Sequence, residues 1–184
     1  ASAAVMAFLY GYGKTKLTTA KIIASYLFGL LAFTIHILVA FGLPLAAFGV
    51  DGWNLPMQIA GTTIPYPFTI LVNLGVIYFV LFAMIGLTLL LSSKMRSPYL
   101  VLIVLVPVLF IPMFLSANGT TGAYNLILFL LPYYAIQPQF GSYISYQLGG
   151  LVLDAFSTRT ILYAALTVCL LPFARRGFKK HQVS

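Results

Sequence analysis

Acidic residues are almost missing from this sequence. It has no glutamate and only two aspartates, Asp51 and Asp154, and neither lies within a long apolar run. Ion-driven transporters need an ionisable group inside the membrane to couple to a proton or cation. Intramembrane hydrolases need paired carboxylates, a metal cluster or a nucleophile beside a base. The shortage of carboxylates therefore argues against both a self-powered transporter and a membrane-embedded enzyme.

Cysteine is also scarce, and nucleotide and metal motifs are missing. Cys169 is the single cysteine, so no internal disulfide can form, and its place in an apolar run predicts a small packing residue. The sequence has no glycine-rich phosphate-binding loop, no metal-ligand cluster and no internal repeat. We therefore expect no enzymatic activity, no cofactor and no metal ion in this chain.

The sequence is rich in apolar residues. Hydrophobic residues make up 61% and charged residues 7%, which leaves too little polar surface to cover a soluble globule. The net charge of +8 could indicate nucleic-acid binding in a soluble protein. Here the basic residues flank apolar runs, so membrane orientation and anionic lipid headgroups explain them better. The sequence predicts an integral membrane protein in contact with the lipid bilayer and no nucleic-acid partner.

The basic residues occur at every second connection between the apolar runs. Residues 45–65 and 117–157 contain no lysine or arginine. Because basic residues close to a span resist translocation, the basic connections are expected to be cytoplasmic. This orientation places the C-terminal tail, residues 175–184, in the cytoplasm of a multi-pass protein, with both aspartates and Arg159 outside. The nine basic residues on the cytoplasmic side are Lys14, Lys16, Lys21, Lys94, Arg96, Arg175, Arg176, Lys179 and Lys180.

The lengths of the apolar runs predict an all-α, polytopic membrane helical bundle. A helix needs about 20 apolar residues to cross roughly 30 Å of hydrocarbon. Pro107 and Pro112 are expected to kink a span without breaking it, because neighbouring groups can satisfy the freed carbonyls. We expect four full spans, at residues 22–46, 68–91, 98–117 and 156–174.

Three shorter segments complete the predicted fold. Residues 123–136 and 140–154 are too short to span and are predicted to be outer re-entrant or interfacial helices. Residues 1–10 are apolar but also too short. They are either a surface anchor or the end of a truncated helix, and we favour the second. Residues 11–21 are predicted to form a cytoplasmic loop, with a sharp turn allowed by Gly11 and Gly13.

A few polar residues lie within the predicted spans. His36 has no catalytic partner at useful spacing, so an interhelical hydrogen bond is favoured over a place on a substrate pathway. Asn73, Thr34 and Thr88 are likewise expected to make interhelical polar contacts, and His36 and Asn73 are the two pathway candidates. The spacing of Ser25 with Gly29, like that of Ala20 with Ala24, allows close helix approach. Asp154 and Arg159 are expected to mark the outer boundary of the last span, not to form an ion pair.

Four segments of this sequence resemble a known family. The likeness runs from about residue 11 to the C-terminus, and the segments are similar to the corresponding parts of type-2 ABC exporter permeases, particularly those of Gram-positive bacteria. They are GYGKTKLTTAKIIASYLF at residues 11–28, FGVDGWNLPMQ at 48–58, LLLSSKMRSPYL at 89–100 and LPFARRGFKKHQVS at 171–184.

The resemblance implies a function. Such permeases have six spans per subunit, so this chain would supply the last four and residues 1–10 would end the second. The short outer segments would match the paired re-entrant helices before the final span. The implied role is the translocation pathway of an ATP-driven exporter in the cell inner or plasma membrane. Two permease subunits, identical or different, would work with nucleotide-binding subunits that hold ATP and Mg.

Residues 11–21 are the expected link to the ATPase subunit. Lys14 and Lys16 offer charge to an acidic groove, Leu17 offers an apolar anchor, and Gly13 and Thr15 complete the segment. In the alternative, these lysines only enforce orientation. The main alternative function is a non-transporting membrane anchor or sensor for a partner. The apolar, aromatic-rich spans suit lipids, hydrophobic drugs and peptides alike as substrates.

Overall fold

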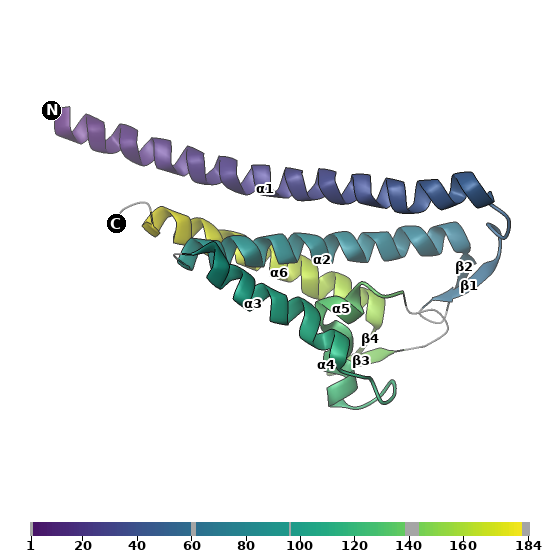
Figure 1. The fold of residues 1–184 in the computed structure, drawn as a ribbon. Helices are drawn as coiled ribbons and strands as arrows, with labels where there is room; N and C mark the ends of the chain where they lie inside the picture. The colour runs from purple at the N-terminus through teal and green to yellow at the C-terminus, as the bar shows by residue number, and fades with distance from the viewer. Residues whose placement is uncertain (1, 60–61, 96, 139–143, 182–184) are drawn as a thin grey trace.

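The structure is a computed structural model that describes residues 2–59, 62–95, 97–138 and 144–181, with only the backbone described at 2–15, 59, 148 and 179–181. It is mostly helical, and three of its helices are long and apolar enough to cross a membrane (Figure 1). These helices are α1 (Ser2–Phe48), α2 (Tyr66–Lys94) and α6 (Ala155–His181). Their length and composition support a membrane helical bundle.

Helix α1 is continuous over 47 residues. The predicted loop at residues 11–21 was wrong, because these residues are helical and no turn occurs at Gly11 or Gly13. A glycine in a helix interior costs only about 1 kcal/mol relative to alanine, which apolar, helix-favouring neighbours offset. Residues 2–10, predicted to be a separate partial helix, belong to the same helix as the first span. The first apolar run therefore extends as one rod well beyond the length that a membrane requires.

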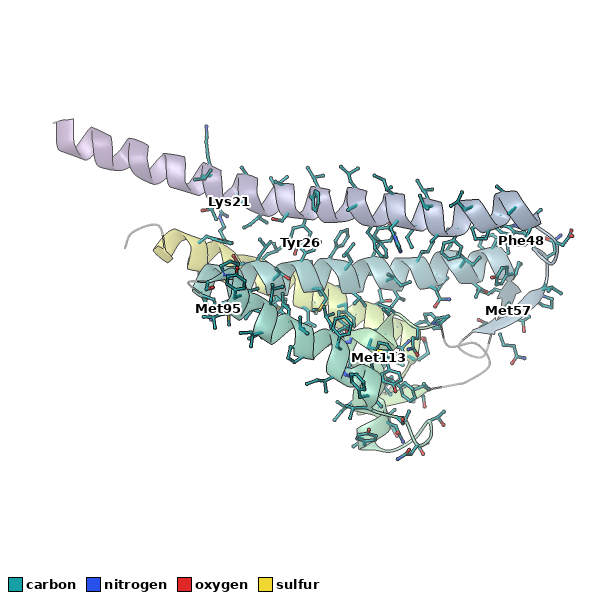
Figure 2. All side chains as sticks on the ribbon, viewed as in Figure 1. Lys21, Tyr26, Phe48, Met57, Met95 and Met113 are labelled. Carbon is teal, nitrogen blue, oxygen red and sulfur yellow. The ribbon has the colours of Figure 1, made fainter. Side chains whose placement is uncertain are left out.

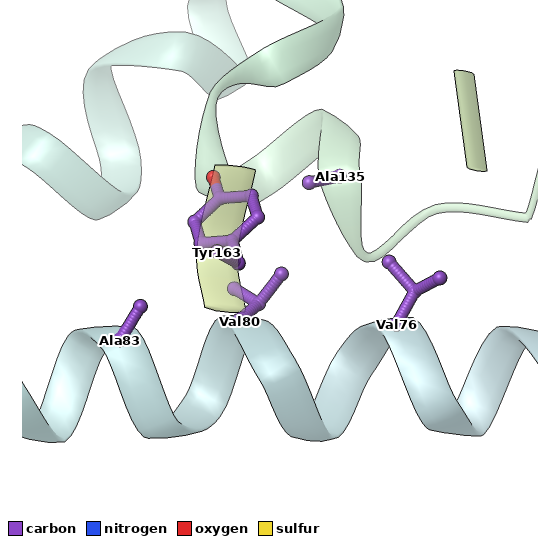
Figure 3. Close-up of a cluster of buried hydrophobic side chains, with 5 residues drawn as sticks. All are labelled: Val76, Val80, Ala83, Ala135 and Tyr163. Atoms are coloured by element: carbon purple, nitrogen blue, oxygen red, sulfur yellow. The ribbon is translucent and has the colours of Figure 1, made fainter. Parts of the chain in front are cut away.

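Helices α2 and α6 run in parallel and form the centre of the bundle. Val76, Val80 and Ala83 lie on one face of α2, at the three- and four-residue spacing that places side chains on one side of a helix. They pack against Tyr163 of α6 and Ala135 (Figure 3). This cluster fixes the two helices side by side along their first halves.

Helix α1 packs against α2 in the opposite direction. The hydroxyl groups of Thr34 and Tyr78 form a hydrogen bond of 2.8 Å, so the interhelical contact predicted for Thr34 is confirmed. Tyr26 donates its hydroxyl to the carbonyl of Phe82 at 3.1 Å. A Cβ on Gly29 would lie 2.5 Å from Ile85 Cδ1, so the close approach expected at Gly29 is also present. The outward surface of α1 remains exposed and apolar.

The third apolar run forms a shorter element. Helix α3 spans Pro98–Phe110, with the Ser97 side chain accepting from the Tyr99 amide at its start. It continues through Pro107 and becomes the 3-10 helix η1 (Ile111–Phe114), which contains Pro112. Together they form an apolar helix over Pro98–Phe114, which is shorter than the three long helices. The third run is thus helical, but less than the full length predicted for residues 98–117.

Short elements close one end of the bundle. Residues 123–136 contain α4 (Ala123–Leu130) and α5 (Pro132–Ala135). Two antiparallel hairpins lie nearby: β1 (Pro56–Ile59) with β2 (Thr62–Pro65), and β3 (Ser145–Leu148) with β4 (Leu151–Asp154). The helix predicted at 140–154 was wrong over the described part, residues 144–154. Gly149, with a φ of 63°, begins a two-residue turn that pairs Leu148 with Leu151.

Charge separates the two ends of the bundle. We call one the basic end, defined by Lys16, Lys21, Lys94, Arg175 and Arg176, and the other the capped end, defined by both hairpins, α4 and α5. Lys21 and Met95 lie toward the basic end, and Phe48 and Met57 lie at the capped end (Figure 2). Both aspartates belong to the capped end, since Asp51 follows α1 and Asp154 ends β4.

Candidate functional site

The basic end gathers lysines and arginines from three helices. A Cβ on Gly177 of α6 would lie 2.7 Å from Ser93 Cβ of α2, so the segments that carry Arg175, Arg176 and Lys94 are in contact. Thr19 and Ile22 of α1 share a small cavity of about 320 Å³ with Arg175. Both aspartates of the sequence, Asp51 and Asp154, lie at the capped end instead.

The predicted coupling residues lie on α1 at the basic end. Only the backbone is described for Gly13, Lys14 and Thr15, and it is helical. Lys16 is exposed, and the Leu17 side chain is 52% exposed. An exposed leucine next to lysines has the chemistry of a contact for an acidic, apolar groove. Because α1 is unbroken, this surface is rigidly connected to the part of α1 that packs on α2.

Among the described residues, no hydrogen bond joins the two pathway candidates, His36 and Asn73. His36 is exposed on α1, and within the described residues its ring makes no hydrogen bond, so the interhelical bond favoured for it is absent there. Asn73 donates to the carbonyl of Thr69, one turn earlier on its own helix, at 2.9 Å. Thr88 does the same to Met84 at 2.8 Å. The interhelical contacts predicted for Asn73 and Thr88 were therefore wrong, since both side chains satisfy their own helix.

The capped end contains a fully buried arginine, Arg159. Arg159 lies one turn into α6, with 0% of its surface exposed. Its Nε donates to the carbonyl oxygen of Phe129 at 3.0 Å. Its Nη2 atom has no hydrogen-bond partner among the described residues. Asp154 instead caps α6, accepting from the amide of Ser157 at 2.9 Å and from its hydroxyl at 2.6 Å. Asp154 precedes α6 and Arg159 lies in its first turns, and among the described residues no ion pair joins them. Their place at the outer boundary of a span stays a prediction.

The buried arginine supplies a hydrogen-bond donor to the end of helix α4. The last carbonyls of a helix have no partners within it, and they carry its partial negative charge. Arg159 pairs with the carbonyl of Phe129, and the Tyr163 hydroxyl donates to that of Leu130 at 2.7 Å. Tyr146 of β3 donates to the carbonyl of Leu126 at 2.9 Å. Arg159 and Tyr163 of α6 thus hold the C-terminal end of α4, and Tyr146 of β3 adds a hydrogen bond to a carbonyl in the middle of that helix.

The environment of Tyr146 keeps its hydroxyl a donor. Burial raises the pKa of this phenol, and the nearby positive charge of Arg159 lowers it less strongly. A neutral phenol can donate the hydrogen bond that a carbonyl requires. One feature of the sequence could have indicated the cluster around Arg159. Nine of the ten basic residues lie at the basic connections, and Arg159 is the exception. Its partners, however, are backbone carbonyls about 30 residues away, which no sequence pattern identifies.

A larger cavity lies between α1 and α2 at the capped end. Its volume is about 570 Å³, and most of its lining is apolar side chains from the two helices. Asp51, Trp53 and Tyr66 also line it. The rings of Trp53 and Tyr66 meet edge to face, with centroids 6.4 Å apart. This size is within the range of roughly 300–1,000 Å³ that is usual for small-molecule sites.

Comparison of the chain with protein-family models, curated proteins and solved structures finds no match. Among the described residues, no three histidine, cysteine or acidic side chains are grouped as a metal ion would require. Three separate regions are therefore candidates for function. They are the exposed surface of α1 at the basic end, the buried cluster around Arg159 and the cavity beside Asp51.

Proposed function

We propose that this chain is a membrane-spanning permease subunit of an ATP-driven ABC exporter. It forms part of the translocation pathway and is coupled to separate nucleotide-binding subunits, which hold ATP and Mg. The observation that carries the proposal is the unbroken length of α1, 47 residues from Ser2 to Phe48. At about 1.5 Å per residue it is some 70 Å long, more than twice the thickness of the hydrocarbon core.

This length supports a mechanical role. A membrane subunit without its own ATPase must receive motion from a soluble partner. A helix that projects from the bilayer with Lys14, Lys16 and Leu17 offers such a partner a contact surface. A helix transmits displacement along its axis without the loss expected from a flexible loop. The Thr34–Tyr78 and Tyr26–Phe82 hydrogen bonds would then pass movement of α1 to α2.

The proposed topology has four crossings, with the basic end in the cytoplasm. The run α3–η1 supplies about 28 Å of helix, close to the thickness of the hydrocarbon core. Residues 115–117 complete the crossing. Helices α4 and α5 and the β3–β4 hairpin then lie at the outer surface of a plasma or inner membrane. A second permease subunit would cover the exposed apolar surface of α1.

The test separates binding of the ATPase from transmission of its motion. Replacing Lys14, Lys16 and Leu17 together with glutamine should abolish co-purification of the nucleotide-binding subunit. The matched control replaces Arg175, Arg176 and Phe173 with glutamine. It removes the same number of positive charges and one apolar side chain elsewhere at the basic end. If only the control variant fails to bind the nucleotide-binding subunit, the contact lies on α6 and not on α1. An assembled triple variant in which ATP hydrolysis still drives export would refute the proposed contact.

A second variant tests the rod. Ala20 is exposed and lies between the proposed contact and the packed part of α1. Ala20→Pro removes a helix hydrogen bond and bends the helix, whereas Ala20→Ser does not. We expect Ala20→Pro to leave the complex assembled and ATP hydrolysis measurable while export falls at least tenfold. Unchanged export would show that α1 does not transmit the motion.

The alternative is a non-transporting anchor or sensor that holds a partner at the membrane. The same exposed surface of Lys16 and Leu17 would serve that role. The two functions differ in the partner: an ATPase subunit that co-purifies with the chain supports the exporter, and a complex with a protein that does not hydrolyse ATP supports the anchor.

A further inference from the structure

We propose that the cavity between α1 and α2 at the capped end binds a hydrophobic cation, an apolar body with one positive charge. The inference rests on the proposed function only in taking such a compound to be the exporter's cargo. The binding itself depends on this chain alone. The cavity of about 570 Å³ is large enough for a compound of drug size.

The walls of the cavity suit an apolar body. Helix α1 contributes Leu38, Phe41 and Leu45, and α2 contributes Ile70 and Leu74. Burying apolar surface against such walls is favourable whatever the detailed shape of the ligand. The walls alone would accept any apolar molecule, including a lipid tail.

The rim of the cavity selects for positive charge. Asp51 is one of only two carboxylates in the chain, and it lines the cavity with Trp53 and Tyr66. Aromatic faces attract cations, and Trp is the strongest of them. No lysine or arginine occurs at residues 45–65 to compete for the carboxylate, and Arg159 is buried against Phe129. A carboxylate and two electron-rich rings are therefore available to one cation.

The loop that carries the rim is held in place. The Trp53 amide donates to the carbonyl of Val50 at 3.1 Å, and the Leu55 amide donates to that of Gly52 at 3.0 Å. The Tyr66 amide donates to the carbonyl of Leu55 at 3.0 Å, which joins the loop to the start of α2. The rim is thus formed before a ligand arrives, which lowers the entropic cost of binding.

Trp53 makes the proposal directly testable, because it is the only tryptophan in the chain. Its fluorescence in the purified, detergent-solubilised chain reports on this cavity. Tetraphenylphosphonium and tetraphenylborate are matched probes with the same four phenyl groups and opposite charge. For the cation, we expect saturable quenching whose Kd rises about three- to tenfold in Asp51→Asn and recovers in Asp51→Glu. For the anion, Asp51→Asn should leave the Kd unchanged or lower it.

A cavity-filling variant places the site. Gly42 lines the cavity, and a Cβ built on it has no neighbour within 4 Å, so Gly42→Phe has room for its ring. We expect it to abolish saturable quenching by the cation. Unchanged binding in Gly42→Phe, or an equal shift of both probes in Asp51→Asn, would overturn the proposal in favour of an unselective crevice for lipid. The two proposals can fail separately. If the chain binds the cation but the tests of the ATPase contact fail, the exporter function is refuted and the binding site is retained.

Discussion

The basic end and the capped end of the bundle are built on different principles. At the basic end, α1 and α6 extend as regular helices, and lysines and arginines lie on their surfaces. At the capped end, the chain turns through two hairpins and two short helices, and buried side chains donate to backbone carbonyls of α4. At the basic end, the repulsion and solvation of charged side chains matter most. At the capped end, the backbone carbonyls must find hydrogen-bond donors.

The comparison shows where a membrane chain carries its specific contacts. A regular helix satisfies its own backbone, so its end needs only water or lipid headgroups around it. Irregular backbone near a bilayer must find partners within the protein, and each missing partner is costly. The capped end is therefore sensitive to single hydrogen bonds, and the basic end to charge and to helix packing.

The largest expected effect concerns orientation. With Cys169 replaced by serine, we expect Thr120→Cys to be labelled by an impermeant thiol reagent on intact cells and Ser92→Cys to be labelled only after permeabilisation. Both positions are exposed, so burial does not decide the result, as it would at the buried Ser93. The opposite pattern of labelling would invert the proposed topology.

The buried arginine tests the capped end. Arg159→Met keeps the apolar stem but leaves the Phe129 carbonyl without its donor. We expect protection of α4 against hydrogen exchange to fall by about 1.5–3 kcal/mol, as for a hydrogen bond to a charged group. Tyr163→Phe removes a neutral donor from Leu130, and about 0.5–1.5 kcal/mol is expected. Unchanged exchange at residues 123–130 in both variants would show that these bonds do not hold α4.

A glycine tests packing near the basic end. A Cβ on Gly177 would overlap Ser93 Oγ and would lie 2.7 Å from Ser93 Cβ. Because backbone as well as side chain must move, we expect Gly177→Ala to destabilise the purified protein by about 1–3 kcal/mol in thermal unfolding. Gly75→Ala is the control, since its Cβ would meet nothing within 4 Å. It should be neutral or stabilising by up to about 1 kcal/mol. Equal effects of the two changes would remove close packing as the reason.

The smallest effect is expected at His36, between the two ends. Its ring is exposed and makes no hydrogen bond within the described residues. His36→Gln should therefore change stability by less than about 0.5 kcal/mol and leave export largely intact. Normal amounts of protein in the membrane with no export would instead place His36 on the transport pathway.

The sequence alone determined the character of the long elements and the separation of charge. Three predicted spans appear as long apolar helices, because a run of some 20 apolar residues satisfies its backbone only as a helix in lipid. The five residues that define the basic end were assigned to one side from their spacing in the sequence, and the structure brings them to one end. Local composition is sufficient for these features because each depends on its own segment.

Only the tertiary structure decided how the short segments fold and what they contact. Residues 144–154 have enough tyrosine and leucine for an interfacial helix, yet they pair as strands, with Tyr146 reaching the carbonyl of Leu126. Arg159 was predicted to mark the outer boundary of the last span, and only the structure shows that it is buried and donates to the carbonyl of Phe129. The partner of each of these side chains is a backbone carbonyl of α4. Because every residue carries the same carbonyl, its availability depends on where the helix ends in space, and the sequence does not specify that position.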